Sequence, residues 1–257
     1  MSDATRYPQG TPCWVDLISD DPAAALAFYR PLLGWIGEPD PEYGGYAVLG
    51  PDGRPVAAIG PAMSGQPPAP TAWTVYFAVD DADTAAARIA EHGGAVTVGP
   101  GDVSRTGRLA LATDPAGAPF GVWQANPFPG FQAARTPGAP IWFELETDRG
   151  RTCAEFYSAV FGVPAPAMEQ MPDAYWLLTV NGGQVAGIWQ DTESQSAPRR
   201  PQWNVYFQVA DTDAAVEAAL ASGAAAVRPA GDSPYGRFAT LADPQGARFS
   251  VIVDAGA

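Results

Sequence analysis

Two carboxylates stand inside strand-like segments and are the side chains in this sequence best suited to acid–base chemistry. Asp16 occurs in CWVDLIS and Glu144 in IWFELET, and a tryptophan (Trp14, Trp142) precedes each of them by two positions. Successive side chains of a strand point to opposite faces, so each carboxylate shares a face with its tryptophan. Burial on such a wall disfavours the charged form and raises the pKa of a carboxyl group. Both residues are therefore candidate general acids or bases.

A second repeated pattern adds tyrosines. WTVYFAV contains Thr74 and Tyr76, and WNVYFQV contains Asn204 and Tyr206. A tyrosine hydroxyl can stabilise a developing oxyanion, and the faces of tryptophan and tyrosine suit a flat, apolar or aromatic ligand. A purely structural role is the alternative reading. The carboxylates could instead accept hydrogen bonds from a tyrosine, an arginine or backbone amides, and the aromatic side chains could pack a core.

The elements that position these residues follow from local patterns. CWVDLIS alternates like a strand, and the next segment predicts a helix capped by Asp20 or Asp21, with proline in its first turn and Gly34 at its end. YAVLGPDGRPVAAIG predicts a hairpin that turns at Asp52-Gly53.

A similar order then follows. WTVYFAV predicts a strand, DADTAAARIAEHGG a capped helix ending at Gly93, and GRLALATDPAGAPFGVWQ a hairpin turning at Asp114–Gly117. We interpret Gly99–Asp102 as a further turn. Strand, helix and then strands predicts an α+β fold with helices outside curved sheets.

The whole arrangement occurs twice. CWVDLISDDPAAALAFYRPLLGW recurs about 128 residues later as IWFELETDRGRTCAEFYSAVFGV, and four such segment pairs keep an offset between 128 and 130. A period this long excludes a solenoid, whose units have about 20–50 residues. We predict a first domain over residues 8–125, a Pro- and Gly-rich linker over 126–138 and a second domain over 139–254.

Two motifs in this repeat point to a family. A helix ends in Phe28-Tyr29 followed by Leu33-Gly34, and each copy closes on an Asp-Pro-x-Gly turn, Asp114–Gly117 or Asp243–Gly246. In this order, and doubled over residues 10–124 and 138–254, they resemble the vicinal-oxygen-chelate (glyoxalase/bleomycin resistance/dioxygenase) family. The resemblance implies four βαβββ modules and one cupped pocket per copy. Phe28 and Tyr29, like Phe156 and Tyr157 in the second copy, are expected in the core.

Metal-dependent members of that family place His, Glu or Gln at four positions per copy. Carried over to this sequence, those positions hold Trp14, Ile59 or Gly60, Thr74 and Gly121 in the first copy, and Trp142, Ile188 or Trp189, Asn204 and Ser250 in the second. None of these is a good metal ligand. The single histidine, His92, is expected at an exposed helix end. We therefore expect neither a metal nor a cofactor, with a carboxylate site built on Asp16 and Glu144 as the open alternative.

The implied pockets supply the candidate site residues. The candidate catalytic residues are Asp16, Glu144, Tyr76 and Tyr206. The candidate ligand-binding residues are Trp14, Thr74, Trp123, Trp142, Trp189 and Asn204. Glu146 shares the strand face of Glu144. Aromatic walls with a few polar groups are typical of a site for a small organic ligand.

Composition narrows the partners. Acidic residues outnumber basic ones 28 to 14, and a formal charge of −14 disfavours nucleic acid and membrane surfaces. The absence of an apolar leader, together with two cysteines expected to be free thiols (Cys13, Cys153), favours a cytoplasmic location. The Ala-, Pro- and Arg-rich composition favours a bacterial source. The protein is expected to be a monomer or a homodimer, and the sequence does not distinguish these two states.

Three functions fit these observations. The first is a metal-independent lyase, isomerase or cyclase acting on an apolar or aromatic metabolite. The second is a non-catalytic protein that sequesters such a compound, as antibiotic-resistance members of the family do. The third is a metal-dependent dioxygenase or glyoxalase. Replacing Asp16 and Glu144 by their amides separates the first two, because only an enzyme loses turnover while it keeps affinity.

Overall fold

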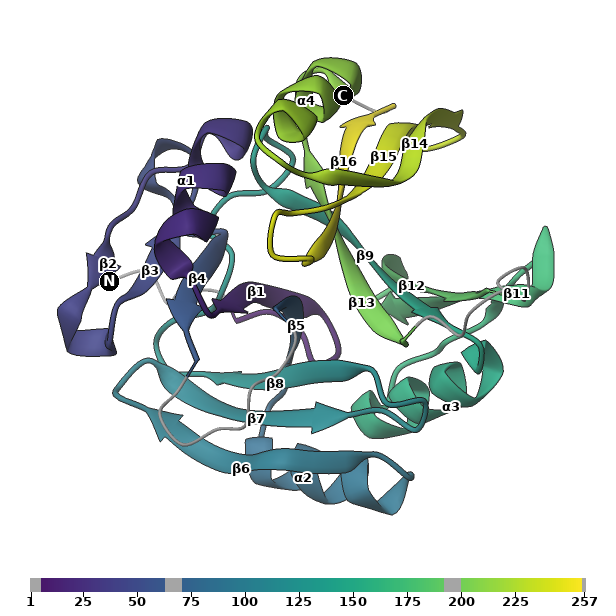
Figure 1. Ribbon diagram of the computed structural model, residues 1–257. Coiled ribbons are helices and arrows are strands. Elements are labelled where there is room, and N and C mark those ends of the chain that lie inside the picture. The colour runs from purple at the N-terminus through teal and green to yellow at the C-terminus, as the bar shows by residue number, and fades with distance from the viewer. Residues whose placement is uncertain (1–5, 63–70, 192–199, 256–257) are drawn as a thin grey trace. The chain divides into compact units, whose positions relative to one another are not determined.

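The computed structural model describes residues 6–62, 71–191 and 200–255, and the chain forms four βαβββ modules (Figure 1). The first module contains β1 (Pro12–Ser19), α1 (Pro22–Leu33), β2 (Pro39–Asp40), η1 (Pro41–Tyr43), β3 (Tyr46–Leu49), η2 (Pro51–Gly53) and β4 (Ala57–Pro61). The second contains β5 (Ala72–Ala78), α2 (Ala82–Glu91), β6 (Ala95–Val103), β7 (Gly107–Thr113) and β8 (Pro119–Ala125). The third contains β9 (Pro140–Thr147), α3 (Gly150–Phe161), β10 (Ala167–Met168), β11 (Met171–Val180) and β12 (Gly183–Gln190). The fourth contains β13 (Gln202–Gln208), α4 (Thr212–Ala221), β14 (Ala225–Ser233), β15 (Gly236–Ala242) and β16 (Arg248–Asp254).

All four modules share one strand pattern. The first strand pairs in parallel with the last, and the remaining pairs are antiparallel. A parallel pair needs a long crossover connection, which the helix provides. The strand orders are β2-β3-β4-β1-β5-β8-β7-β6 and β10-β11-β12-β9-β13-β16-β15-β14. The predicted α+β class, with βαβββ modules in two mixed sheets, is confirmed.

The helices begin and end at the predicted signals. The Asp21 carboxylate, rather than that of Asp20, accepts the N–H of Ala24 at the start of α1, and Gly34 ends this helix with φ +65°. His92 is the exposed C-terminal cap of α2. None of the helices in the described ranges is both long and apolar enough to cross a membrane.

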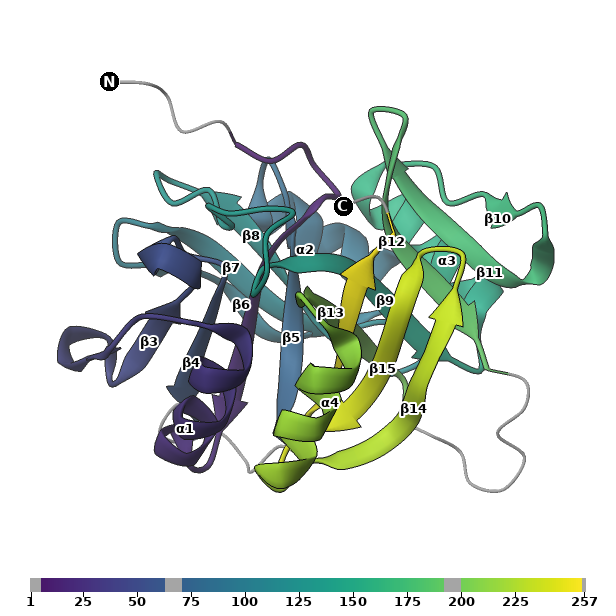
Figure 2. The same ribbon diagram turned by 90° about the horizontal axis from the view of Figure 1, so that it is seen from above.

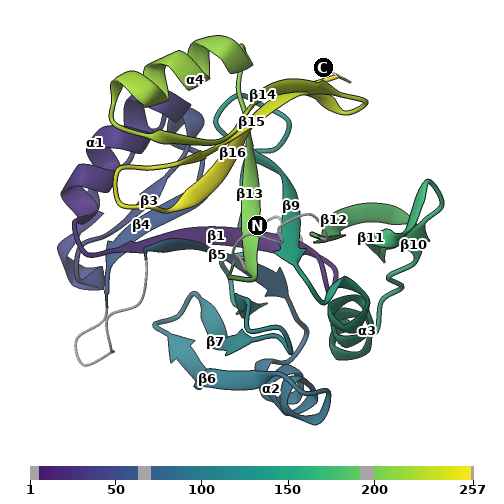
Figure 3. The same cartoon turned by 45° about the vertical axis from the view of Figure 1, so that its right-hand side comes forward.

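The chain divides into two compact units, and each unit combines one module from each copy. Unit 1 comprises Met1–Trp14, Thr74–Gly130 and Trp142–Trp203, and unit 2 comprises Val15–Trp73, Phe131–Ile141 and Asn204–Ala257. In unit 2, α1 packs beside α4 (Figure 2), and in unit 1, α2 packs beside α3 (Figure 3). The packing that holds each unit together therefore joins the first copy to the second.

A buried hydrogen-bond network lies under the helices of unit 2. The Tyr29 hydroxyl donates to Asp243 Oδ2 at 3.0 Å and accepts from Trp73 Nε1 at 3.1 Å. Tyr29 is completely buried, as predicted for the Phe-Tyr motif. Asp243 belongs to the Asp-Pro-x-Gly turn of the other copy. The two motifs that recur along the sequence thus bind each other between copies.

Unit 1 repeats this network. The Tyr157 hydroxyl donates to Asp114 Oδ2 at 3.2 Å and accepts from Trp203 Nε1 at 2.9 Å. Asp114 Oδ1 also accepts the N–H groups of Ala116 and Ala118, which closes the turn. Burial is the largest cause that raises the pKa of the Asp114 carboxyl, and it also raises the pKa of the Tyr157 hydroxyl. Both groups belong to the packed interior.

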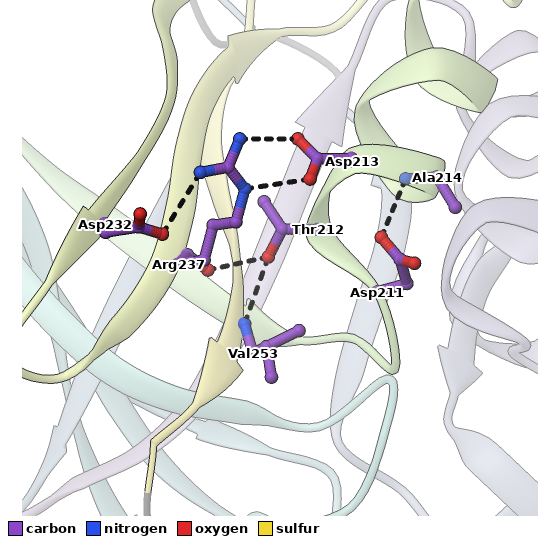
Figure 4. Close-up of polar contacts among 7 residues, drawn as sticks. All are labelled: Asp211, Thr212, Asp213, Ala214, Asp232, Arg237 and Val253. Atoms are coloured by element: carbon purple, nitrogen blue, oxygen red, sulfur yellow. Dashed lines mark hydrogen bonds and ion pairs between the residues drawn. The ribbon is translucent and has the colours of Figure 1, made fainter.

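A second polar connection fixes the start of α4 to its sheet (Figure 4). The Arg237 guanidinium binds both carboxylate oxygens of Asp213, at 2.8 and 2.9 Å, and contacts Asp232 at 3.1 Å. The Thr212 hydroxyl donates to the carbonyl oxygen of Arg237 at 2.6 Å and accepts the N–H of Val253 at 3.2 Å. The helix is thereby attached to β15 and β16 at the point where it begins.

One predicted turn is wrong. Gly99–Asp102 lies inside β6, not at a turn, although the register of this strand shifts between Val98 and Gly101. β6 is an edge strand of its sheet, so Pro100, which has no N–H group, can lie there without removing a hydrogen bond between strands. The predicted hairpins at Asp52-Gly53 and Asp114–Gly117 are confirmed.

Candidate functional site

The candidate carboxylate of unit 1 lies on the face of the third module opposite α3. Phe143 and Leu145 alternate with Glu144 along β9 and are buried on the helix side. Glu144 is only 8% exposed, and its Oε2 accepts a hydrogen bond from the Tyr175 hydroxyl at 2.6 Å. The Tyr175 oxygen in turn lies 3.3 Å from Trp142 Nε1, which donates to it. Trp142, Tyr175 and Glu144 therefore form one hydrogen-bonded series.

A glycine makes room for this series. Gly187 on β12 is the register partner of Glu144, and a Cβ at this position would overlap the Tyr175 hydroxyl. Trp189, two residues further along the same strand, is the register partner of both Tyr175 and Glu146. The side chains of Trp142, Glu144, Glu146, Tyr175 and Trp189 thus share one strand face, which we call the Glu144 face.

Unit 2 contains a shorter version of the same arrangement. Asp16, which is 4% exposed, accepts from the Tyr46 hydroxyl at 3.1 Å through Oδ2. The Tyr46 ring lies against Gly60 on β4, where a Cβ would collide with it. A hydrogen bond from a tyrosine hydroxyl to each carboxylate is one of the purely structural roles that the sequence allows for these residues. Such a donor also restricts the orientation of the carboxylate.

The sequence patterns missed both tyrosines. Tyr46 and Tyr175 stand 129 positions apart, as 175 − 46 = 129, and both precede two residues and a leucine. This offset lies within the range of the other repeated segments. The repeated Tyr-x-x-Leu was therefore a signal, although it does not indicate which carboxylate each tyrosine binds.

The predicted tyrosine Tyr76 lies against Gly121. The two residues are register partners on β5 and β8, and a Cβ on Gly121 would overlap the Tyr76 ring. Nearby in unit 1, Trp123 Nε1 donates to the carbonyl oxygen of Phe128 at 2.8 Å, and the Trp14 ring meets Phe128 edge-on at 5.0 Å between centroids. The predicted tryptophans Trp14 and Trp123 are thus joined through a linker phenylalanine, which the sequence analysis did not include. Thr74, on the same strand, is half-buried.

The matching face of unit 2 is polar. Asn204 Nδ2 donates to Ser250 Oγ at 2.8 Å, and Ser250 Oγ lies 2.8 Å from Thr240 Oγ1. All three residues are buried. Tyr206, the register partner of Ser250, packs against Phe238 at 5.8 Å between ring centroids. Two positions taken from the family resemblance, Asn204 and Ser250, are therefore in direct contact.

These positions do not fit a divalent metal. Within residues 6–62, 71–191 and 200–255, no three His, Cys, Asp or Glu side chains are grouped so that they could hold a metal ion. At the first copy's last-strand position, Gly121 has no donor and the Tyr76 ring fills the space beside it. At the second copy's position, Asn204 and Ser250 are neutral and bind each other. Metal sites in proteins are usually built from carboxylates, imidazoles or thiolates, and this donor set lacks them.

Family comparisons agree with the duplicated fold. Residues 13–122 match the profile of the Glyoxalase/Bleomycin resistance protein/Dioxygenase superfamily, and residues 142–252 match that of the Glyoxalase-like domain. The chain belongs to this superfamily, with two domains in tandem. The family resemblance inferred from the sequence is confirmed.

Bacterial members of the superfamily resemble the chain over nearly its full length. The anthracycline biosynthesis protein DnrV of Streptomyces peucetius is 39% identical over 269 residues, covering 96% of this chain and 94% of the relative. A provisionally named glyoxylase, CFP32 of Mycobacterium tuberculosis, is 39% identical over 257 residues and is covered, like this chain, to 98%.

Solved structures of the superfamily share the fold. The Mn(II)-bound glyoxalase of Novosphingobium aromaticivorans superposes with a TM-score of 0.65 at 17% identity, covering 97% of this chain and 85% of that one. A mutant of 4-hydroxymandelate synthase from Streptomyces coelicolor has a TM-score of 0.61 at 18% identity, covering 98% and 94%. At these identities, the likeness concerns the fold alone.

Proposed function

We propose that the chain is an acid–base enzyme that acts without a metal on a flat aromatic metabolite, with Glu144 as the group that takes and returns a proton. The hydrogen-bonded series of Trp142, Tyr175 and Glu144 carries this proposal. The Tyr175 hydroxyl accepts a hydrogen bond from the indole N–H of Trp142 and donates one to the Glu144 carboxylate, so its orientation is set from both sides. Asp16 with Tyr46 forms the corresponding pair in the first copy.

The chemistry follows from the acceptor capacity of the carboxylate. The Tyr175 hydroxyl donates to Glu144 Oε2, and a carboxylate can accept more than one hydrogen bond. Glu144 takes a proton from a substrate carbon next to a carbonyl group, and the electrons of the broken C–H bond move onto the carbonyl oxygen. Return of the proton to another atom gives an isomer, whereas loss of a neighbouring hydroxyl as water completes an elimination. Stabilising the oxyanion is the role predicted for Tyr76, which lies in the same unit as Glu144.

Two observations support a flat aromatic substrate: the aromatic side chains of the Glu144 face and the name of a similar protein. The Glu144 face carries the rings of Trp142, Tyr175 and Trp189, which suit a flat ligand. A relative at 39% identity over almost the whole chain is named for anthracycline biosynthesis. Anthracyclines are fused-ring quinones with ketone and phenol groups, so a member of this compound class offers both a flat surface and acidic carbon positions.

A direct assay tests the proposal. The purified protein is incubated with doxorubicin, a soluble anthracycline, and with related polycyclic ketones. The products are then separated by chromatography, and their molecular masses are measured by mass spectrometry. We expect a product of unchanged mass or one that has lost water. Glu144→Gln should lower the rate of its formation by about 10²–10⁴-fold while affinity persists. Glu155→Gln, the same change at an exposed position on α3, serves as the matched control.

Sequestration is the second candidate, and the same experiment separates it from catalysis. Three aromatic side chains on one face favour tight binding whether or not a reaction follows. Retained affinity without any product from the unmodified protein would leave binding as the function. Glu144→Gln would then change affinity only.

Independence from metal is tested by chelation. Protein purified without an affinity metal should keep full turnover after prolonged dialysis against EDTA, because the described donor set does not fit a divalent ion. Loss of turnover that Mn²⁺ or Fe²⁺ restores would refute the metal-free mechanism.

A further inference from the structure

The strand β13 has one apolar face and one polar face. Phe207 packs against the rings of Trp35 and Trp73 at 5.4 and 5.3 Å between centroids, on the side of the helices. Asn204, Tyr206 and Gln208 alternate with this side and lie on the opposite face. β13 is buried along its whole described length apart from its half-buried first residue, so the polar face carries two amides into the interior of unit 2.

Both amides have an oxygen without a partner. Asn204 is fully buried, and its nitrogen donates to Ser250, but its Oδ1 makes no hydrogen bond. Gln208, 7% exposed, likewise has a buried Oε1 that makes none. An acceptor held out of water without a donor is destabilising, and native proteins retain few of them. Two such oxygens on one strand face indicate that they accept hydrogen bonds from a molecule that is not part of the chain.

The surroundings of Asn204 orient its amide. Ser250 lies between Asn204 and Thr240, at 2.8 Å from each. With Asn204 Nδ2 engaged by Ser250, the Oδ1 atom is the end of the amide left for a ligand. Tyr206 follows Asn204 by two positions on this face and packs against Phe238.

The first copy lacks these amides. At the positions of Asn204 and Gln208 it has Thr74 and Ala78. A fold that needed amides there for its own stability would be expected to keep them in both copies. The amides therefore distinguish the second copy, and their role is specific to it.

We propose that the β13 face of the second copy is a ligand subsite that accepts hydrogen bonds from hydroxyl groups of a flat aromatic compound. Asn204 Oδ1 receives one hydroxyl and Gln208 Oε1 receives another, with the Tyr206 and Phe238 rings contacting the ligand between them. Residues four apart in a strand are separated by about 13 Å, which matches the length of a fused-ring system with a hydroxyl at each end. The proposal rests on the proposed function for the aromatic ligand class, but not on any catalysis.

The probes are three related quinones. Anthraflavic acid carries one phenol hydroxyl at each end of an anthraquinone, its dimethyl ether has the same oxygens without their protons, and anthraquinone has neither. Binding is measured by fluorescence quenching or calorimetry, so turnover is not needed. We expect the unmodified protein to bind anthraflavic acid at least about tenfold more tightly than the other two, because a site built around hydroxyl donors rejects analogues that lack them.

Asn204→Leu should remove most of this preference, by about 5–50-fold, and Gln208→Leu should remove less because Gln208 is slightly exposed. Gln132→Leu, which removes an amide that is exposed, should leave the preference intact. Asn204→Thr, which installs the residue of the first copy, gives the same readout if the leucine variant does not fold.

Two results would overturn the proposal. An unchanged preference in folded Asn204→Thr or Asn204→Leu protein would show that the amide faces only water. Equal or absent binding of all three quinones by the unmodified protein would exclude the assigned ligand class. If Glu144→Gln loses turnover but still prefers anthraflavic acid, both proposals are supported independently. If the unmodified protein shows this preference but no turnover, only the catalytic proposal is refuted.

Discussion

Units 1 and 2 have the same hydrogen bonds on the side of the sheets that faces the helices. On the opposite side, the residues at matching positions of β5 to β8 and β13 to β16 differ. Asp114 and Asp243 each bind a buried tyrosine hydroxyl, and each tyrosine binds an indole N–H. On the other face, the register partner of the repeated tyrosine is Gly121 in the first copy and Ser250 in the second. The residue beside it is Leu111 in one copy and Thr240 in the other.

This comparison separates what the fold needs from what a ligand selects. Packing between the copies depends on the helix side, so a change there destabilises a whole unit. The opposite face contributes less to that packing and has become polar in one copy only. The two units are therefore equivalent on the helix side and differ on the opposite strand face.

The largest expected effect concerns the two carboxylates. Glu144→Gln should lower turnover about 10²–10⁴-fold, the usual contribution of a general acid or base, while Asp16→Asn should lower it less than about tenfold. Glu144 has the shorter bond to its tyrosine, 2.6 against 3.1 Å. Steady-state kinetics on both variants checks the asymmetry. A loss of only about twofold in each variant would mean that each carboxylate serves its own equivalent site.

The helix-side networks should respond equally. Tyr157→Phe and Tyr29→Phe each remove the donor to a buried aspartate and the acceptor of an indole N–H. We expect each to lower the free energy of unfolding by about 2–3 kcal/mol, because the carboxylate Oδ2 and the indole N–H each lose the tyrosine hydroxyl while they stay buried. Urea denaturation measures both. A large effect in one unit alone would break the equivalence of the scaffolds.

Exchanging the diverged residues tests the other side of the comparison. Gly121→Ser places a Cβ into the Tyr76 ring and should cost about 1–2 kcal/mol of stability through overpacking. Ser250→Gly removes the partner shared by Asn204 and Thr240 and should cost a similar amount. Thermal unfolding of both variants provides the readout. A neutral Gly121→Ser would show that the Tyr76 ring moves freely.

The smallest expected effect is a pH dependence carried by Asp114. Burial raises its pKa in the folded protein, so the folded state binds this proton more readily than the unfolded chain does. Its contribution to stability is therefore greatest below the unfolded pKa of about 3.9 and is lost as the pH rises through the folded value. Relative to Asp114→Asn, the unmodified protein should gain stability on acidification. A stability difference that does not change with pH would contradict this.

Local sequence patterns predicted the four modules because caps, glycine turns and alternation act within short segments. They also placed Asp16 and Glu144 on the faces of Trp14 and Trp142. They could not assign Tyr46 and Tyr175 as donors, because those hydrogen bonds join different strands, 30 and 31 residues away. Nor does a repeat indicate that a motif of one copy binds the other copy.

The connection between Tyr29 and Asp243 spans 214 residues, against 43 for Tyr157 and Asp114. A ribosome that adds about 5–20 residues per second separates the synthesis of residue 73 from that of residue 243 by roughly 10–30 s. Unit 1 has all its segments once residue 203 is made, whereas unit 2 must wait for the C-terminal module. The N-terminal module therefore emerges first and is completed last. Until the fourth module is made, the apolar helix side of the first module lacks its partner, and apolar surface exposed in this way is prone to aggregation.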